Sequence, residues 1–487
     1  MEVLLKIWIF FVNNILTQPA YFIGFIVLIG YILLKKPWYE CLAGFLKATV
    51  GYLILTVGSG GLVGNFRPIL VGLKDKFNLQ ATVIDPYYGQ NAVQSAMEHI
   101  GKSFSQVMLL LLIAFIFNIL LVAFRKITKI RSIFTTGNVQ IQQAATAFWL
   151  IFFCFPELGD TPILIVMSLL LGLYWAVGSN LTVEITQDLT EGGGFCVAHQ
   201  QIFALKIFST IAEKIKGKGE GKKLEDIKLP GFLSIFNENM VSTAILMLLF
   251  FGVILITLGK DYLIENKFMK EGQSFFFYTL TTALYFAVYL AILQLGVRTF
   301  VTELTQSFQG ISTRLLPGAV PGIDCAATFG FGSANAVTIG LLFGAAGQFL
   351  AIITLILLKS PVIIIAGFIP VFFDNATIAV FANNRGGVKA ACILPFISGL
   401  CQVFGSAFIS YWVGLAAYGG YLGMWDWAVL WPGFTIIMKY LGYIGIGIVA
   451  LILIAIPQIQ YFRNKDTYFL ITDDYEAYKE KMKSKVN

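Results

Sequence analysis

Long apolar runs separated by short polar loops limit the folds open to this chain more than any other feature of its sequence. A helix that crosses a membrane needs roughly 20 apolar residues. Only 13% of the residues are charged, about half the share that is typical of soluble domains. The sequence therefore predicts an all-α polytopic membrane protein with about eleven transmembrane helices, at 14–35, 40–63, 104–124, 139–156, 162–180, 237–259, 276–297, 333–358, 361–382, 389–413 and 432–460.

The distribution of Lys and Arg predicts the orientation of the chain, because cytoplasmic loops carry an excess of both. Basic clusters at 35–36, 125–131, 206–228, 385–389 and 463–485 place the N-terminus outside and the C-terminus in the cytoplasm. Five lysines oppose this assignment, namely Lys74, Lys76, Lys260, Lys267 and Lys270. The net charge of +7 is thus explained by topology, and we expect no nucleic-acid partner.

The segment 205–230 is first amphipathic and then rich in lysine. One interpretation is a solvated cytoplasmic loop that touches anionic membrane lipid. The other is a docking surface for an acidic soluble partner.

The cysteines and histidines indicate neither a metal site nor a cofactor. Six cysteines are scattered without the C-x-x-C spacing of a metal or redox motif, and the chain has two histidines. Free buried thiols are the expected state. No phosphate-binding glycine loop is present, so transport driven by ATP bound to this chain is not expected.

Two aspartates point to an internal repeat. Asp85 in "ATVIDPYYG" and Asp324 in "PGAVPGIDCAATFG" each follow an isoleucine after an apolar span and an amphipathic stretch. Further along, "QQAATAF" (142–148) resembles "DNATIAVF" (374–381). Five predicted spans in each repeat would invert the second copy, an arrangement typical of alternating-access transporters with broken or re-entrant helices around a midplane site.

The repeat predicts five regions along the chain. They are a first membrane repeat (1–205), a cytoplasmic basic loop (206–230), a second membrane repeat (231–428), a last transmembrane helix (429–461) and a charged cytoplasmic tail (462–487).

Ionisable residues inside membrane segments are costly and are therefore candidates for function. Asp324 is either a ligand or base, or the N-cap of the helix that follows. Asp85 is more simply explained as a turn in which Pro86 begins a helix, although Tyr87 beside it would suit a sugar-like ligand.

Two polar clusters complete the candidate site. The first consists of His199, Gln200 and Gln201 in "GFCVAHQQIF", and the second of Asn138, Gln140, Gln142 and Gln143 in "TTGNVQIQQ". Several amides with one imidazole and few charges suit a polyhydroxylated or weakly acidic small molecule.

The motifs "TVGSGGL", "GFCVAHQQIFA", "LPGAVPGIDCAA" and "GFIPVFFDNATI" occur in this order and extend the resemblance over about residues 28–440. In them the chain resembles the membrane IIC component of the L-ascorbate phosphotransferase system. The resemblance implies a homodimer in the bacterial inner membrane, in which each protomer has a scaffold domain and a transport core that moves like an elevator. It also implies separate IIA and IIB polypeptides, with the phosphate donor a cysteine of IIB and no autonomous catalysis by this chain.

The resemblance further implies which residues contact L-ascorbate. Asp324 is expected to act as the base for the substrate hydroxyl, and Asp85 and Gln143 are secondary candidates. Two positions depart from the family pattern: Asn138 stands where relatives have a histidine, and Pro86 where they offer a hydroxyl. The expected contacts are Pro86, Tyr87, Asn138, Val139, Gln140, Ile141, Gln142, His199, Gln200 and Asp324.

The internal repeat and its two aspartates, considered without the family resemblance, are also compatible with a second function. A secondary transporter of a sugar acid could bind H⁺ or Na⁺ at Asp85 and Asp324. The two functions differ in energy source, since group translocation needs phosphoenolpyruvate whereas symport needs an ion gradient.

Overall fold

The computed structural model of the chain describes residues 18–77, 80–216, 222–228, 230–232, 235, 239–316 and 318–486. Three described apolar helical segments have only 10–17 residues: Ile23–Leu33, Met247–Leu258 and Phe275–Tyr289. The predicted class, a polytopic membrane protein, is confirmed, while the count of eleven spans stays a prediction, and residues 14–17 of the first span lie outside the described part. Six described helical segments are long and apolar enough to cross a membrane: Trp38–Gly58, Gln106–Ala123, Asp160–Thr190, Asn335–Leu357, Pro370–Trp412 and Asp426–Arg463.

Helices make up most of the described chain. They are α2 (Pro19–Leu33), α3 (Trp38–Phe77), α4 (Pro86–His99), α5 (Ser105–Ala123), α6 (Arg125–Thr128), α7 (Gly137–Cys154), α8 (Asp160–Thr190), α9 (Ile202–Lys216), α10 (Asn239–Leu258), α11 (Lys260–Glu265), α12 (Phe275–Leu315), α13 (Ala334–Leu357), α14 (Asn375–Trp412), α15 (Trp431–Arg463), α16 (Leu470–Asp473) and α17 (Tyr475–Val486). The strands are β1 (Gln80–Ile84), β2 (Ser132–Phe134), β3 (Cys196–Val197), β4 (Val320–Ile323), β5 (Val362–Ala366) and β6 (Gly420–Tyr421).

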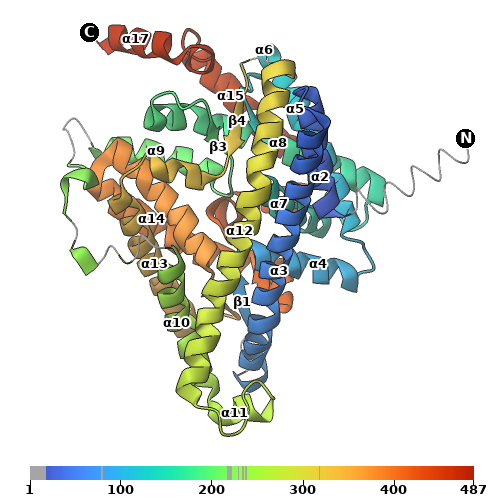
Figure 1. Cartoon of the computed structure of the whole chain (residues 1–487), viewed down its shortest axis with the longest axis vertical. Coiled ribbons are helices and arrows are strands. Elements are labelled where there is room, and N and C mark those ends of the chain that lie inside the picture. Colours follow the sequence, from blue (N-terminus) through green and yellow to red (C-terminus); the bar gives the residue numbers. More distant parts are fainter. Residues whose placement is uncertain are drawn as a thin grey trace, which may run out of the picture.

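Four helices, α2, α3, α10 and α12, pack against one another. The two longest of them, α3 and α12, lie side by side and run in opposite directions along the long axis of the molecule (Figure 1). Each leads into a strand, α3 into β1 and α12 into β4. The remaining long helices pack mainly among themselves, with α13 on α14 and α5 on α8.

The strands form two small parallel sheets, one in the order β5-β1-β6 and the other in the order β2-β4-β3. In the first sheet a strand from the N-terminal half of the chain lies between two strands from the C-terminal half. The second sheet has the reverse arrangement. Each sheet therefore joins the two halves of the chain, and its central strand is the one that precedes Asp85 or Asp324.

These sheets correct the all-helical expectation. The segment 361–382, predicted as one transmembrane helix, begins as strand β5 and continues through a π-helical turn, Pro370–Asp374, into α14. The run "VIIIA" is rich in β-branched residues, which favour strands. A short apolar run alone does not distinguish a buried strand from a buried helix. The prediction was wrong here because one apolar run, long enough for a membrane helix, contains the boundary between a strand and a helix.

Two glycines interrupt long helices. Gly387 in α14 has φ 71° and Gly442 in α15 has φ 56°, a region of backbone space that L-residues rarely adopt. Each helix is therefore two helical pieces joined at a kink. Residues 206–216 of the predicted basic loop continue α9, whose apolar face is buried against α8 and α14; residues 217–221 of that loop lie outside the described part.

Candidate functional site

Asp85 and Asp324 occupy matching positions, each directly after the central strand of its sheet. The Asp85 carboxylate accepts a hydrogen bond from the Tyr87 N–H at 3.0 Å, and the Asp324 carboxylate accepts one from the Ala326 N–H at 2.9 Å. Asp85 thereby caps α4, and Asp324 caps a 3₁₀ turn, Cys325–Gly330. Asp85 thus begins a helix as the sequence suggested, whereas Asp324 caps this turn and the N-cap of the following long helix α13 is Ser333.

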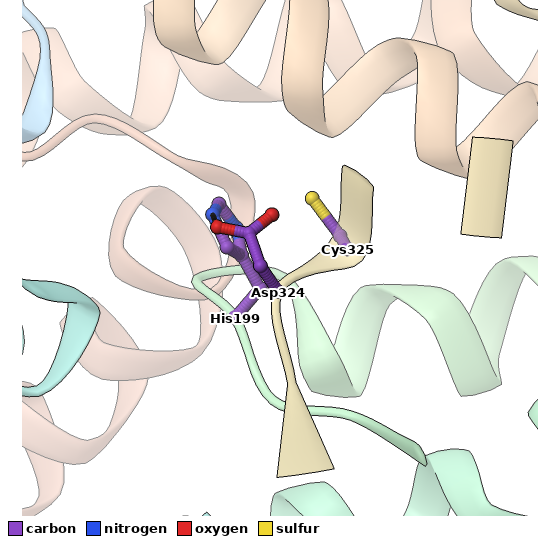
Figure 2. A group of neighbouring side chains, drawn as sticks. All are labelled: His199, Asp324 and Cys325. Atoms are coloured by element: carbon purple, nitrogen blue, oxygen red, sulfur yellow. Dashed lines mark ion pairs between the residues drawn. The ribbon is translucent and has the colours of Figure 1, made fainter. Parts of the chain in front are cut away.

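Burial separates the two aspartates. Asp85 is 1% exposed, whereas the Asp324 side chain is 24% exposed. The second carboxylate oxygen of Asp324, Oδ2, lies 3.8 Å from His199 Nε2, and Figure 2 shows the carboxylate against the imidazole ring. Asp324 therefore has an oxygen directed toward other candidate groups, while Asp85 is enclosed.

The pairing of β3 with β4 brings His199 to Asp324. Val197 is in register with Ile323, so the two chain segments leave the sheet together and their next residues remain neighbours. Parallel strands end at the same edge of a sheet. Residues that are far apart in the sequence thus reach one place because their strands are adjacent.

The start of α7 contributes the amide groups of the site. The Gln200 side-chain amide donates to Gln142 Oε1 at 2.9 Å, and the Gln143 amide donates to the His199 carbonyl at 3.1 Å. The Tyr87 side chain lies against those of Asn138 and Gln142. Predicted residues from α4, from α7 and from the loop after β3 are therefore in mutual contact.

Two buried oxygens of this cluster have no hydrogen-bond partner: Asn138 Oδ1 and Gln200 Oε1. Asn138 is 8% exposed and Gln200 is fully buried. Buried polar atoms are nearly always paired, and an unpaired one costs about 1–3 kcal/mol. Both oxygens can therefore accept a hydrogen bond from a further donor.

His199 is held in a defined orientation. Its Nδ1 lies 2.7 Å from Gln201 Oε1, and its ring stacks on that of Phe373. The Gln201 amide nitrogen donates to the Phe373 carbonyl at 3.3 Å, which directs the amide oxygen toward the histidine. Nδ1 therefore carries a proton and Nε2 faces Asp324.

The other predicted residues support the cluster from within the protein core. Pro86 is the first residue of α4, where its fixed φ suits a helix start. Val139 and Ile141 belong to the hydrophobic core. The Gln140 amide donates to the Phe134 carbonyl at 3.3 Å, which ties α7 to the end of β2.

Two buried carboxylates were missed as candidates. Asp374 Oδ2 accepts from the Gln402 amide and from the Trp425 N–H, at 2.5 and 2.7 Å. Asp426 accepts from the Tyr174 hydroxyl at 2.8 Å and from two backbone N–H groups at the start of α9, both at 3.0 Å. The sequence does contain a signal for Asp374, because this residue begins "DNATIAVF", which resembles "QQAATAF" at 142–148.

The cysteines are free thiols, as the sequence predicted, but they are not all buried. All six are free, and four of them are buried: Cys41, Cys154, Cys196 and Cys325.

Comparison with known proteins places this arrangement in a family. The model of the family described as "PTS system sugar-specific permease component" matches residues 14–428. A relative from Mycoplasma pneumoniae, "Ascorbate-specific PTS system EIIC component", is 32% identical over 434 residues, which cover 81% of this chain and 65% of the relative. The chain thus spans somewhat less than two thirds of that relative's length.

Proposed function

The chain belongs to the family of sugar-specific permease components of the phosphotransferase system, and on that premise we propose that it carries L-ascorbate across the bacterial inner membrane. In this proposal the substrate becomes phosphorylated during uptake by a partner IIB phosphocysteine, which a IIA component recharges. The relative named as ascorbate-specific supports this choice of substrate. The absence of a histidine at Asn138 leaves room for a closely related sugar acid.

The unpaired acceptors Asn138 Oδ1 and Gln200 Oε1 carry the substrate proposal. Ascorbate offers side-chain hydroxyl groups that can donate to these oxygens, and satisfying a buried acceptor removes its desolvation cost. The His199 ring is held close by, where a protonated imidazole would attract the anionic enolate. Tyr87 lies against Asn138 and Gln142 and supplies a ring face beside them.

Asp324 is the proposed base. One of its carboxylate oxygens caps the following turn, which fixes the side chain, and the other faces His199. In the transfer step the substrate's primary hydroxyl oxygen forms a bond to phosphorus and the sulfur–phosphorus bond of the IIB phosphocysteine breaks. The thiolate leaves with IIB, and the hydroxyl proton passes to Asp324. Phosphoryl transfer depends mainly on positioning and charge stabilisation, so this chain positions the hydroxyl and the partner holds the phosphate.

The two sheets support the proposed inverted repeats. Each repeat would contribute a long helix, a central strand and a cap: α3, β1 and Asp85 in the first, and α12, β4 and Asp324 in the second. Each central strand pairs with two strands of the other repeat. Such exchange is expected where two related halves enclose a shared site.

The packing of α2, α3, α10 and α12 on one another supports their assignment as the scaffold domain, through which we propose that two protomers form a homodimer. The remaining long helices would form the transport core.

The positions of basic elements support the proposed orientation, with the C-terminus in the cytoplasm. Helix α6, which carries two of the basic residues, lies at the same end of the molecule as α17 (Figure 1). Arg125 of α6 pairs with Asp473 beside the tail helix at 3.1 Å. Helix α11, near which three of the exceptional lysines lie, is at the opposite end.

The test is uptake of labelled L-ascorbate by cells that express this chain with its IIA and IIB partners. We expect the label to appear inside as a phosphorylated product, to depend on IIB and to persist when an ionophore collapses the ion gradients. Uptake of free ascorbate that stops with the ionophore would refute group translocation and favour the ion-coupled alternative. Uptake of another sugar acid alone, phosphorylated in the same way, would refute only the substrate.

A further inference from the structure

Three metal-ligating side chains meet where β3 and β4 end (Figure 2). His199 follows β3, while Asp324 and Cys325 follow β4, and one donor atom of each lies within 4.8 Å of the others. The sequence spacing gave no sign of this group, because 125 positions separate the histidine from the aspartate. The parallel register of the two strands brings them together.

The surroundings of His199 direct a lone pair into the group. Gln201 Oε1 can only accept a hydrogen bond, so Nδ1 is the donor to it and Nε2 is the ring atom left to bind a metal. Nε2 then faces Asp324 Oδ2 at 3.8 Å. When the imidazole is neutral, a cation between Nε2 and the carboxylate would be stabilised by both atoms. A metal-bound imidazole nearly always donates its other ring N–H to an oxygen acceptor, most often a carboxylate, a backbone carbonyl or water, and Gln201 Oε1 is the oxygen in that position here.

We propose that His199, Asp324 and Cys325 bind a thiophilic divalent cation, for which Zn²⁺ is the probe. A tetrahedral Zn²⁺ holds a nitrogen and an oxygen ligand about 3.3 Å apart and a nitrogen and a sulfur ligand about 3.5 Å apart, given metal–ligand distances of about 2.0 Å for nitrogen or oxygen and about 2.3 Å for sulfur. The His199–Asp324 pair lies at 3.8 Å and all three donor atoms lie within 4.8 Å of one another, so the side chains must close in on the metal. Nitrogen and sulfur ligands select Zn²⁺ over Mg²⁺ or Ca²⁺.

Binding changes the protonation of one ligand. The Cys325 thiol loses its proton to solvent as the sulfur–metal bond forms, because only the thiolate ligates. Three protein ligands leave the fourth position of the metal open to water. With three protein ligands the site has the same number as zinc sites that keep one position for water or substrate.

This inference rests on the proposed function in one respect, the consequence for transport. The cation takes His199 Nε2 and the Asp324 carboxylate, the two groups that the proposed function assigns to substrate. Zn²⁺ therefore acts as a competitor of the sugar acid. The proposed function assigns no role to Cys325, so a substitution there separates metal binding from transport.

The first experiment uses the purified full chain in detergent with Co²⁺ as a spectroscopic substitute for Zn²⁺. We expect a thiolate-to-cobalt charge-transfer band in the wild type and in Cys392→Ser, a matched control at a half-buried cysteine of α14. In Cys325→Ser the band is lost and Zn²⁺ binds at least about tenfold more weakly, since even the loss of an outer-shell partner has that effect. A wild type without the band overturns the proposal. In His199→Asn, which retains the thiol, an undiminished band overturns it as well.

The second experiment measures ascorbate uptake in the presence of Zn²⁺. We expect Zn²⁺ to raise the apparent KM of the wild type and of Cys392→Ser, whereas Cys325→Ser becomes resistant while its uptake without metal is unchanged. Equal inhibition of all three proteins, or stimulation by Zn²⁺, would overturn the competition. The cobalt band needs no substrate, so a chain that shows the band but takes up no ascorbate refutes the proposed function and leaves the metal site standing.

Discussion

Replacing each of the two capping aspartates by asparagine should have opposite effects. Asparagine caps a helix about as well as aspartate, so both substitutions keep the hydrogen bond to the following backbone and remove the charge. The rest of the environment differs. Asp85 is 1% exposed and also receives the backbone N–H of Ile369, whereas the second oxygen of Asp324 faces His199.

The magnitudes follow from these contacts. In Asp85→Asn one oxygen becomes an amide nitrogen, and a buried N–H donor loses its acceptor, at a cost of about 1–3 kcal/mol in the free energy of unfolding. In Asp324→Asn no donor is left unpaired, so stability should hardly change. The loss of a general base, however, lowers a rate by about 10²–10⁴-fold.

Two measurements on each variant separate these effects. Thermal unfolding in detergent reports stability, and the initial rate of ascorbate phosphorylation, divided by the amount of folded protein, reports activity. We expect Asp85→Asn to unfold earlier but to phosphorylate at a rate close to that of wild type. Asp324→Asn should unfold like wild type and phosphorylate at a rate lower by the factor above.

Two outcomes would contradict these roles of the aspartates. If Asp324→Asn phosphorylates normally, Asp324 is a cap and the base lies elsewhere. If both variants lose uptake without losing stability, the aspartates act as a pair, as the ion-coupled alternative requires.

Three further outcomes are expected. Asn138→Leu removes one acceptor for a substrate hydroxyl and should raise the KM for ascorbate about 2- to 13-fold, the equivalent of 0.5–1.5 kcal/mol for a neutral hydrogen bond; an unchanged KM would exclude this contact. Asp426→Ala leaves two backbone N–H groups and a tyrosine hydroxyl without their acceptor and should lower the free energy of unfolding by about 3 kcal/mol or more, seen as earlier thermal unfolding. Gly442→Ala forces an L-residue to φ 56° and should lower the free energy of unfolding by about 1–3 kcal/mol. Gly433→Ala on the same helix, which likewise has open space around it, should be neutral or slightly stabilising. Equal effects of the two substitutions on thermal unfolding would contradict the backbone explanation.

The apolar runs and the local signals near them were readable from the sequence. The length of the runs predicted a polytopic membrane protein, and "DPYY" predicted the turn and helix start at Asp85. The clusters at 135–143 and 199–200 were recognisable because amides and an imidazole are costly in an apolar segment. These properties depend on residue type and on near neighbours, which a single sequence displays.

The tertiary structure alone decided which of these groups meet. Strand β4 lies between β2 and β3, and this pairing sets His199 beside Asp324 and Cys325. The same packing encloses Asp85 and leaves Asp324 partly open, a difference that two similar Ile-Asp motifs do not reveal. Pairing between distant strands is set by the register and packing of the whole fold, since each strand is only two to five residues long and has too little sequence to specify its partner.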